Sequence, residues 1–424
     1  MAEVRRRTVL GVSLAAAGAA SGCAGVARTV GLGDSVRVAV SWSAAELAAF
    51  RSVLRGWREA DFELIPFGDD IDAALGARTT GRPNVLALPR LGLVGDNRDN
   101  LEPLPADIPW HPEYDQILGD QSGQRYALPF KLAHKSVVWY RRRLFADLGL
   151  TAPRTWADWL ALNESIIRQG GVAPLALGGA DGWMLTGFFE NILLRNHPDT
   201  YDELARPRRD PAMWRGAAVR SAFDLFGQMC GRPGVFAGGP NRALVQQFPD
   251  AVLEVFRYHR AAMVVAPDFA ESVIRRFGVA LEEVGTFTFP AVSNPDGPLV
   301  LAGDLLVLTR PAGPGARELI RYLATPQAPE PWIRDTGGFL AANPETSASL
   351  YGPVLSGLDT ELRRSMAAGR ARFDLGDQLG PVGGRDGLQL VLVEFLRRLG
   401  AGGRRDEAVR AALDAMADIE TKVG

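Results

Sequence analysis

The chain has 424 residues, and its 47 Lys and Arg residues against 49 Asp and Glu residues leave a formal net charge of −2. The length suffices for two domains, and the near-neutral charge provides no positive field for nucleic acid, so no nucleic-acid partner is expected. One of the two cysteines lies in the N-terminal segment. Cys230 is therefore left without a disulfide partner, and its helical surroundings predict a small buried residue.

The N-terminal segment predicts an exported protein. Arg5, Arg6 and Arg7 precede an apolar run at residues 9–20, which is shorter than the ~20 residues of a membrane-spanning helix. A basic cluster followed by a short apolar run is typical of a secretory signal peptide. The Arg-Arg-Thr-Val-Leu stretch also resembles a twin-arginine signal, and the general export route stays open as the alternative.

Small residues then lead into Cys23, an order that resembles a bacterial lipobox, although Ala20 stands where the usual lipobox has Leu. We therefore expect residues 1–23 to be a signal peptide and Cys23 to be lipidated. Residues 24–33 form a Gly- and Ala-rich tether. The mature protein would then be anchored by lipid to the outer face of the cytoplasmic membrane. A plain signal peptide, cleaved nearby with an incidental cysteine, is the alternative.

Strands and helices alternate in the first part of the mature chain, which predicts an α/β domain with a parallel sheet. Val-rich or wholly apolar stretches predict strands, and apolar residues at helical spacing predict helices. The predicted strands are 35–42, 62–67, 83–89 and 123–130, and the predicted helices are 44–60 and 69–81.

The middle of the chain is mainly helical, and the last part returns to strands before a helical end. Helical periodicity marks residues 155–170, 181–196, 213–230, 315–325 and 404–424. Buried strands are predicted at 261–267, 284–292 and 298–310.

Several motifs in order resemble the family 1 extracellular solute-binding proteins of ABC transporters, the maltose-binding type. The most specific is "GQRYALPFKLAHKSVVWYRRRLFADLGLTAPRTWADWLAL" at residues 123–162. "GRPNVLALP" and "LEPLPADI" precede it, although Asn84 replaces the usual Asp of the first motif. "AAMVVAPDF", "FTFPAV", "LAGDLLVLTR" and "ELIRYLATPQAPEPWIRDTGGFLAANPET" follow in the family's order.

The resemblance implies the α/β periplasmic-binding-protein fold, in which two lobes close on a ligand and the chain crosses the hinge three times. The implied lobes are 34–130 plus 291–336 and 131–290 plus 337–424. The partners implied are a small-molecule ligand, most simply a sugar, and the permease subunits of an ABC importer. A monomer without cofactor or metal is expected.

A sugar site needs aromatic faces for the ring and carboxylates or amides for the hydroxyl groups. Trp42 ends the first predicted strand, at the edge where open α/β sheets bind ligands, and Glu46 begins the next helix. Trp183 follows a glycine-rich loop. Phe269 stands where the resemblance implies a stacking tryptophan, with Asp268 beside it. Trp42 and Trp183 could instead be core residues, and Glu46 a solvated helix charge.

Four further residues lie near the implied cleft. Asp304 either faces it or binds the hinge backbone. The segment "KLAHK" adds Lys131, His134 and Lys135, which are unusual at this place in the family. If they point to solvent, the ligand is a neutral sugar. If they face the cleft, the ligand carries a carboxylate or phosphate, as in a sugar acid or a polyol phosphate.

Two other classes of function remain open at this point. The four histidines lack metal-ligand spacing and no nucleophile motif occurs, but a carboxylate pair for glycoside hydrolysis is not excluded. A sensory receptor lipoprotein would share the fold and differ only in its membrane partner.

Overall fold

The computed structural model describes residues 35–42, 44–68, 71–76, 82–89, 91–118 and 123–423. The predicted signal peptide, Cys23 and the tether lie outside the described residues. Asp34–Gly424 forms one compact unit.

Strands and helices alternate along most of the described chain. The strands are β1 Val36–Val40, β2 Phe62–Pro66, β3 Val85–Leu88, β4 Leu101–Glu102, β5 Ala127–His134, β6 Val137–Arg141, β7 Ala173–Ala176, β8 Ala261–Val265, β9 Val284–Thr288, β10 Leu299–Thr309, β11 Leu340–Ala341 and β12 Ala371–Phe373.

The α-helices are α1 Ala44–Leu54, α2 Ile71–Gly76, α3 Gly92–Asp96, α4 Pro112–Leu118, α5 Arg142–Asp147, α6 Trp156–Gln169, α7 Trp183–Asn196, α8 Pro198–Leu204, α9 Ala217–Cys230, α10 Gly239–Ala243, α11 Phe248–Phe256, α12 Ala270–Arg276, α13 Pro314–Leu323, α14 Glu330–Asp335, α15 Pro353–Ala367, α16 Leu375–Gln378, α17 Leu388–Gly400 and α18 Arg405–Val423. A 3₁₀ turn, η7 Gly380–Gly383, follows α16.

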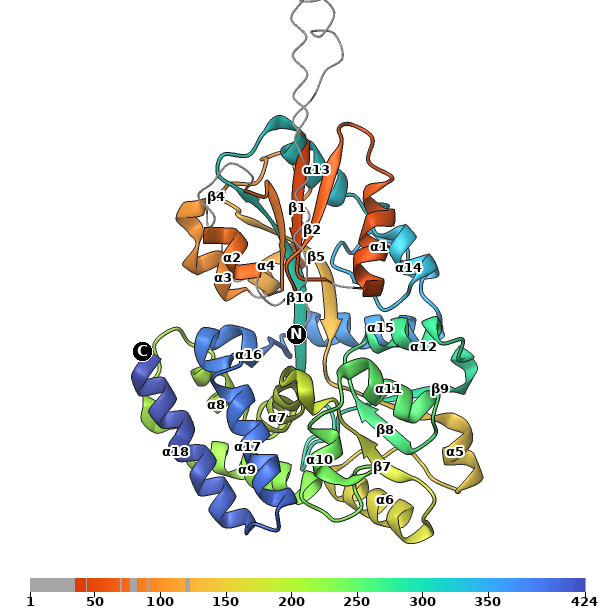
Figure 1. The fold of residues 1–424 in the computed structure, drawn as a ribbon. Coiled ribbons are helices and arrows are strands. Elements are labelled where there is room, and N and C mark those ends of the chain that lie inside the picture. Colours follow the sequence, from red (N-terminus) through yellow and green to blue (C-terminus); the bar gives the residue numbers. More distant parts are fainter. Residues whose placement is uncertain are drawn as a thin grey trace, which may run out of the picture. The chain divides into compact units, whose positions relative to one another are not determined.

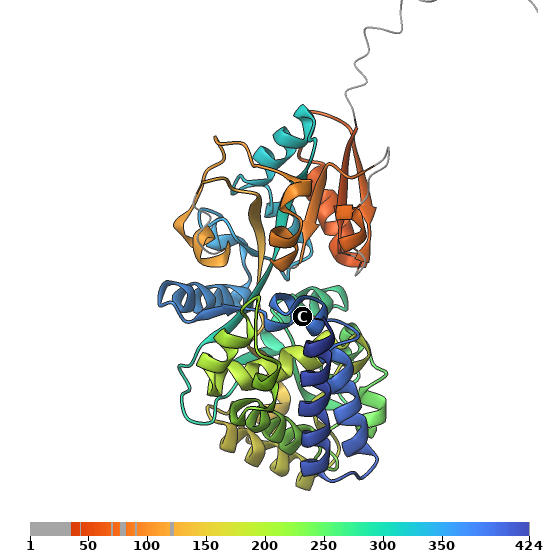
Figure 2. The same ribbon diagram turned by 90° about the vertical axis from the view of Figure 1, so that its left-hand side faces the viewer.

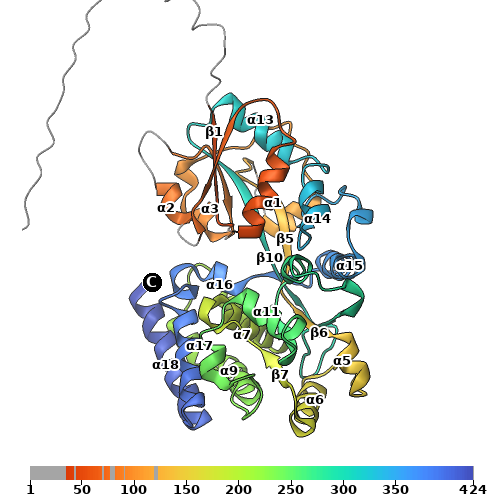
Figure 3. The ribbon, with the colours of Figure 1, turned by 45° about the vertical axis from the view of Figure 1, so that its right-hand side comes forward.

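The first sheet has the strand order β11-β5-β10-β3-β1-β2, with β4 and β12 also pairing with β10. β1 runs parallel to β2 and β3, so that Val38 pairs with both Leu64 and Val85, whereas β10 runs antiparallel to β3 and β5. Figures 1 and 3 show α1 and α14 on one side of this sheet and α2 and α3 on the other. Cover on both sides explains why β1 and β3 are almost wholly apolar.

The second sheet has the order β7-β8-β6-β9, with β6 antiparallel to β8 and β9 and β7 parallel to β8. The two C-terminal helices, α17 and α18, run side by side in Figure 2. They pack against α9, whose last residue is Cys230. Cys230 is fully buried, as predicted, and burial raises the pKa of its thiol. Within the described residues no helix has the length and apolar character to span a bilayer.

The chain passes between the sheets along three segments. It leaves the first sheet after β5 and enters the second at β6, and it returns between β9 and β10. It leaves again after β12 and continues into α16 and α17, of which α17 packs against α7. β11 still pairs with β5 of the first sheet. We propose that these three passages are the hinge crossings. The third passage lies later in the chain than the boundary predicted at residues 336–337, and the predicted lobe boundaries stay an untested prediction.

Candidate ligand-binding site

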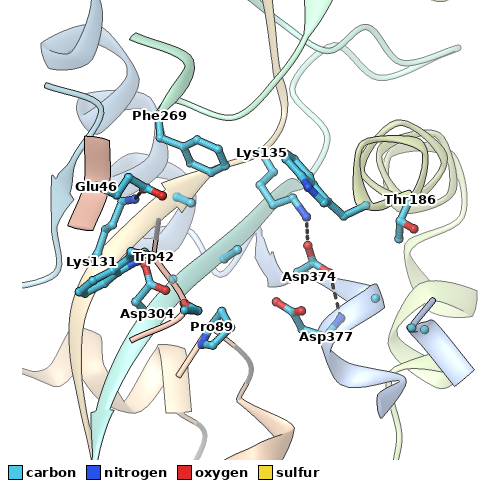
Figure 4. Close-up of a pocket in the computed structure, with 18 of the residues that line it drawn as sticks. Trp42, Glu46, Pro89, Lys131, Lys135, Thr186, Phe269, Asp304, Asp374 and Asp377 are labelled. Carbon is cyan, nitrogen blue, oxygen red and sulfur yellow. Dashed lines mark hydrogen bonds and ion pairs between the residues drawn. The ribbon is translucent and has the colours of Figure 1, made fainter. Parts of the chain in front are cut away.

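A cavity of about 290 Å³ is lined by residues of the first sheet, of α7, of the turn after β8, and of the segment after β12 up to the start of α17. Trp42 and Pro89 lie directly after β1 and β3. These two strands are parallel neighbours, so their carboxyl ends reach the same edge, where α/β sheets bind ligands. Figure 4 shows the polar side chains converging on this space. The lining residues are Ser41, Trp42, Glu46, Pro89, Lys131, Ala133, Lys135, Trp183, Thr186, Phe269, Ala302, Gly303, Asp304, Asp374, Gly376, Asp377, Gly383, Gly384 and Gln389.

The alternation of β5 determines which basic residues reach the cavity. Residues i and i+2 of a strand share a face, and Lys131, Ala133 and Lys135 all line the cavity, whereas His134 points to the other face. Asp304 of β10 is the direct cross-strand partner of Lys131, so these two side chains share that face as well. A β-bulge follows between Asp304 and Leu305, a feature that re-aims side chains near binding sites.

The ammonium of Lys131 lies in a buried cluster. Its side chain is 3% exposed, and Nζ lies 2.6 Å from Oε1 of Glu46. Nζ also lies 5.0 Å from the ring centre of Phe269 and 5.2 Å from that of Trp332, within cation–π range. Burial lowers the pKa of Lys131, but Glu46, Asp304 and a third carboxylate outweigh it and raise the pKa above its usual value.

Asp304 is 9% exposed, and burial raises the pKa of its carboxyl to about 6. Lys131 counters this shift by favouring the charged form, while the charge of Glu46 adds to it. The nearby indole N–H of Trp42 also favours the charged form, although Nε1 does not reach hydrogen-bond geometry with any described group. Asp304 therefore lines the cavity as a buried carboxylate.

A second buried cluster surrounds Lys135. Its Nζ lies 3.0 Å from Oε1 of Glu190, which is fully buried, and it pairs with Asp374 on the other side. Glu190 Oε2 accepts the backbone N–H of Leu375 at 2.8 Å. Asp374 caps α16 by accepting the backbone N–H of Asp377 at 3.0 Å (Figure 4). The ion pairs thus fix the segment after β12 against α7 and β5.

Aromatic rings supply the apolar wall. Phe269 packs against Trp183 with 6.0 Å between ring centres and against Phe248 with 5.3 Å. Both Phe269 and Trp183 are half-buried and line the cavity. Trp42 is buried among Phe50, Phe130 and Trp332, with its ring centre 4.8 Å from Phe50 and 5.0 Å from Trp332. Trp42 is therefore a core residue that also faces the cavity.

The structure brings seven of the nine predicted ligand-binding residues together around the cavity. These are Trp42, Glu46, Lys131, Lys135, Trp183, Phe269 and Asp304. One of the two interpretations required Lys131 and Lys135 to point to solvent. Both side chains instead line the cavity. Contact of these seven residues with a ligand remains a proposal.

The structure places His134 and Asp268 elsewhere, which corrects their expected position in the cleft. Both are fully buried and neither lines the cavity. Asp268 Oδ1 accepts the backbone N–H of His134 at 2.7 Å, and His134 Nε2 lies 3.2 Å from Oε2 of Glu361. Burial raises the pKa of Asp268 to about 8, against the opposing effect of Lys131. These two residues join the ends of β5 and β8 instead of facing a ligand.

The sequence reasoning missed the third part of the wall, which follows β12. Asp374, Asp377 and Gln389 contribute polar groups, and Gly383 and Gly384 contribute backbone. A Cβ at Gly383 would collide with the backbone of Gly376, so this close approach requires glycine. The glycine-rich stretch "DLGDQLGPVGG" at residues 374–384 was the available signal.

Thr186 of α7 was missed as well. It is buried and lines the cavity, and its hydroxyl has no partner among the described groups. No group of three or more His, Cys, Asp or Glu in the described part of the chain could hold a metal ion. The site therefore offers aromatic faces, carboxylates, an amide and a hydroxyl.

A family model described as "Bacterial extracellular solute-binding protein" matches residues 92–328, more than half of the chain. The chain belongs to this family. The resemblance inferred from the motifs is thereby confirmed. The prediction of a binding protein instead of an enzyme is confirmed with it.

Two relatives in this family cover most of the chain. It is 28% identical over 322 residues to the osmoprotective compounds-binding protein GgtB of Synechocystis sp., which covers 71% of this chain and 73% of that protein. It is 26% identical over 351 residues to the alpha-glucosides-binding periplasmic protein AglE of Rhizobium meliloti, covering 76% and 74%.

A solved structure has the same fold. The bacterial solute receptor AcbH superposes with a TM-score of 0.74 at 16% identity, over 92% of this chain and 98% of that one. The predicted two-lobe α/β fold of solute-binding proteins is therefore confirmed.

Proposed function

We propose that this solute-binding protein captures a carbohydrate in the cavity and delivers it to the permease of an ABC importer. The observation that carries the proposal is the wall itself, in which Trp42, Trp183 and Phe269 stand beside Glu46 and Asp304. Aromatic faces match the apolar faces of a sugar ring, and carboxylates accept its hydroxyl protons.

The printed roles of the relatives support a carbohydrate. AglE is named for alpha-glucosides, and AcbH is described as having an exclusive preference for β-D-galactopyranose. GgtB is named for osmoprotective compounds. The cavity of about 290 Å³ lies at the lower end of the usual range for small-molecule sites, which favours a short saccharide over a long one.

The pairing of the lysines favours a sugar without an acidic group over a sugar acid or a polyol phosphate. Lys131 is hydrogen-bonded to Glu46, and Lys135 pairs with Glu190 and Asp374. An anionic ligand would have to displace one of these carboxylates. The charges of the two lysines, which suggested an acidic ligand, are thus already neutralised by carboxylates of the protein.

The first test is a thermal-shift screen with neutral mono- and disaccharides, sugar acids and polyol phosphates. A neutral sugar at ~100 times its dissociation constant is expected to raise the free energy of unfolding by about 2.7 kcal/mol. Stabilisation by the acids or phosphates alone would contradict the proposal of a sugar without an acidic group. Copurification with permease and ATPase subunits distinguishes a transport role from that of a sensory receptor lipoprotein.

Phe269 is expected to stack on the sugar ring. Phe269→Ala should weaken binding of the sugar that the screen identifies by roughly 1–3 kcal/mol, because a half-buried ring face would lose its contact. Titration calorimetry measures the change. Phe277→Ala removes an exposed phenyl ring outside the cavity and serves as the control. An affinity equal to that of the control would assign Phe269 to the core alone.

We propose that Cys23 carries the lipid anchor. Cys23→Ser should move the protein from the membrane fraction to the soluble fraction of the producing cells. Stable attachment needs more than one acyl chain, as in a bacterial lipoprotein, and loss of the acceptor thiol removes all of them. A Cys23→Ser variant that still sediments with membranes would count against the anchor.

A further inference from the structure

Asp304 differs in its partners from Glu46 and Asp374, two other carboxylates of the cavity. Glu46 is paired with Lys131, and Asp374 is paired with Lys135. In the part of the chain that the structure describes, the Asp304 carboxylate forms no ion pair with a Lys, Arg or His, and the lysines of the cavity pair with other carboxylates. A buried carboxylate without a counter-charge is costly, because water no longer solvates it.

The charged groups around Asp304 do not balance. Lys131, opposite it in the β5–β10 ladder, is a cation whose charge acts on Asp304, but its Nζ is engaged by Glu46 at 2.6 Å. Lys131, Glu46 and Asp304 together carry one positive and two negative charges when ionised. The Lys135 cluster repeats the pattern, because one ammonium faces both Glu190 and Asp374. The Lys131 cluster and the Lys135 cluster thus each hold one carboxylate more than they hold ammonium groups.

Two polar groups near this excess charge also have no partner in the protein. The Nε1 atom of Trp42 and the Oγ1 atom of Thr186 are buried without a hydrogen-bond partner among the described groups, and both residues line the cavity. Trp42 is 4% exposed and Thr186 is 3% exposed. Unsatisfied groups of this kind are uncommon in folded proteins. They indicate that a polar ligand completes this site.

We propose that Asp304 binds a ligand ammonium group, so that the preferred solute is an amino sugar. This inference rests on the proposed carbohydrate-binding function and narrows it. A charged N–H donor forms a shorter and stronger hydrogen bond to a carboxylate than a hydroxyl group does. The ammonium would also remove the excess negative charge beside Lys131. A carboxylate or phosphate at the same place would add to that charge and be rejected.

The test compares hexoses, their monoamino derivatives with the amine at each ring carbon or at the exocyclic carbon, and the matching N-acetyl sugars. Titration calorimetry is run at about pH 7, above the pKa of about 6 of Asp304, so that the carboxylate is charged. At least one amino sugar is expected to bind at least tenfold more tightly than its parent hexose. Its N-acetyl form, which is neutral, should lose that advantage.

The isosteric variant Asp304→Asn should bring the amino sugar and its parent to similar affinities. Asp96→Asn, at an exposed position of α3, changes the net charge equally outside the cavity and should keep the preference. If Asp304→Asn does not fold, the comparison of the three sugars in the wild type still decides the matter.

Equal or tighter binding of every parent hexose would overturn the amino-sugar assignment and leave the carbohydrate proposal standing. Loss of the amino-sugar preference in Asp96→Asn as well would assign the effect to net charge and not to Asp304. If no sugar of any of the three kinds binds, both proposals fall.

Discussion

Replacing Lys135 with Met is expected to destabilise the folded protein by about 3–5 kcal/mol. The side chain of Lys135 is 10% exposed, and its Nζ compensates Glu190, which is fully buried, and Asp374. Met retains much of the aliphatic stem but removes the charge, so two buried carboxylates would remain without their cation. Because Asp374 belongs to the cavity wall, the variant should also lose ligand affinity.

Urea unfolding followed by circular dichroism measures the stability loss, and the matched control is Arg143→Met. Arg143 forms an exposed pair with Asp147 at 3.8 Å, so its removal should change stability by no more than about 0.5 kcal/mol. A Lys135→Met variant as stable as the control at neutral pH would show that Lys135 does not compensate these groups.

Trp42→Ala is expected to cost about 3–5 kcal/mol of stability, the usual effect of deleting a buried aromatic side chain. The Trp42 ring packs edge-on against Phe50 and Trp332, and its removal would open a hole in the core beneath the cavity. Since one face of the indole also lines the cavity, ligand affinity should fall together with stability.

Trp42→Phe separates the two roles. A phenyl ring preserves most of the packing, so it should cost less than half of the stability lost in Trp42→Ala, while it removes the indole N–H. Chemical unfolding and calorimetry on both variants give the two effects separately. Full stability in Trp42→Ala would contradict the assignment of Trp42 to the core.

Lys131 connects the two sheets through its contacts. Its ammonium is bonded to Glu46 on α1, beside the first sheet, and lies over the ring of Phe269, which follows β8 of the second sheet. A ligand that displaces or strengthens either contact changes the interaction between the two parts. We propose that this side chain takes part in the closure on ligand, since a ligand shifts a hinge equilibrium only through contacts that differ between its two states.

The amino-acid sequence by itself predicted several of the buried strands and the candidate site residues that follow them. β1, β3, β8 and β10 lie within predicted strands, because a short apolar run that contains Val and is bounded by turn residues favours a buried strand. Trp42 was found for the same reason, since it ends such a predicted strand, whereas Phe269 was found from the resemblance to the family. The α1 prediction extended to residue 60, but the helix ends at Leu54, just before Gly56.

Only the tertiary structure decided which side chains meet and which charges are compensated. Lys131 and Glu46 are 85 residues apart in sequence, and Thr288 and Glu361 are 73 apart. Lys135 meets Asp374 from the far end of the chain, and no local pattern encodes such a pair. The two-residue period of a strand could have predicted that His134 lies on the other face of β5 from Lys131 and Lys135. Which of these faces borders the cavity depends on how β5 packs in the folded protein.

The position of the segment after β12 in the cavity wall also depends on the tertiary structure. Its short turns have no periodicity, and its position follows from the ion pairs and close glycine contacts that form only when the chain is folded.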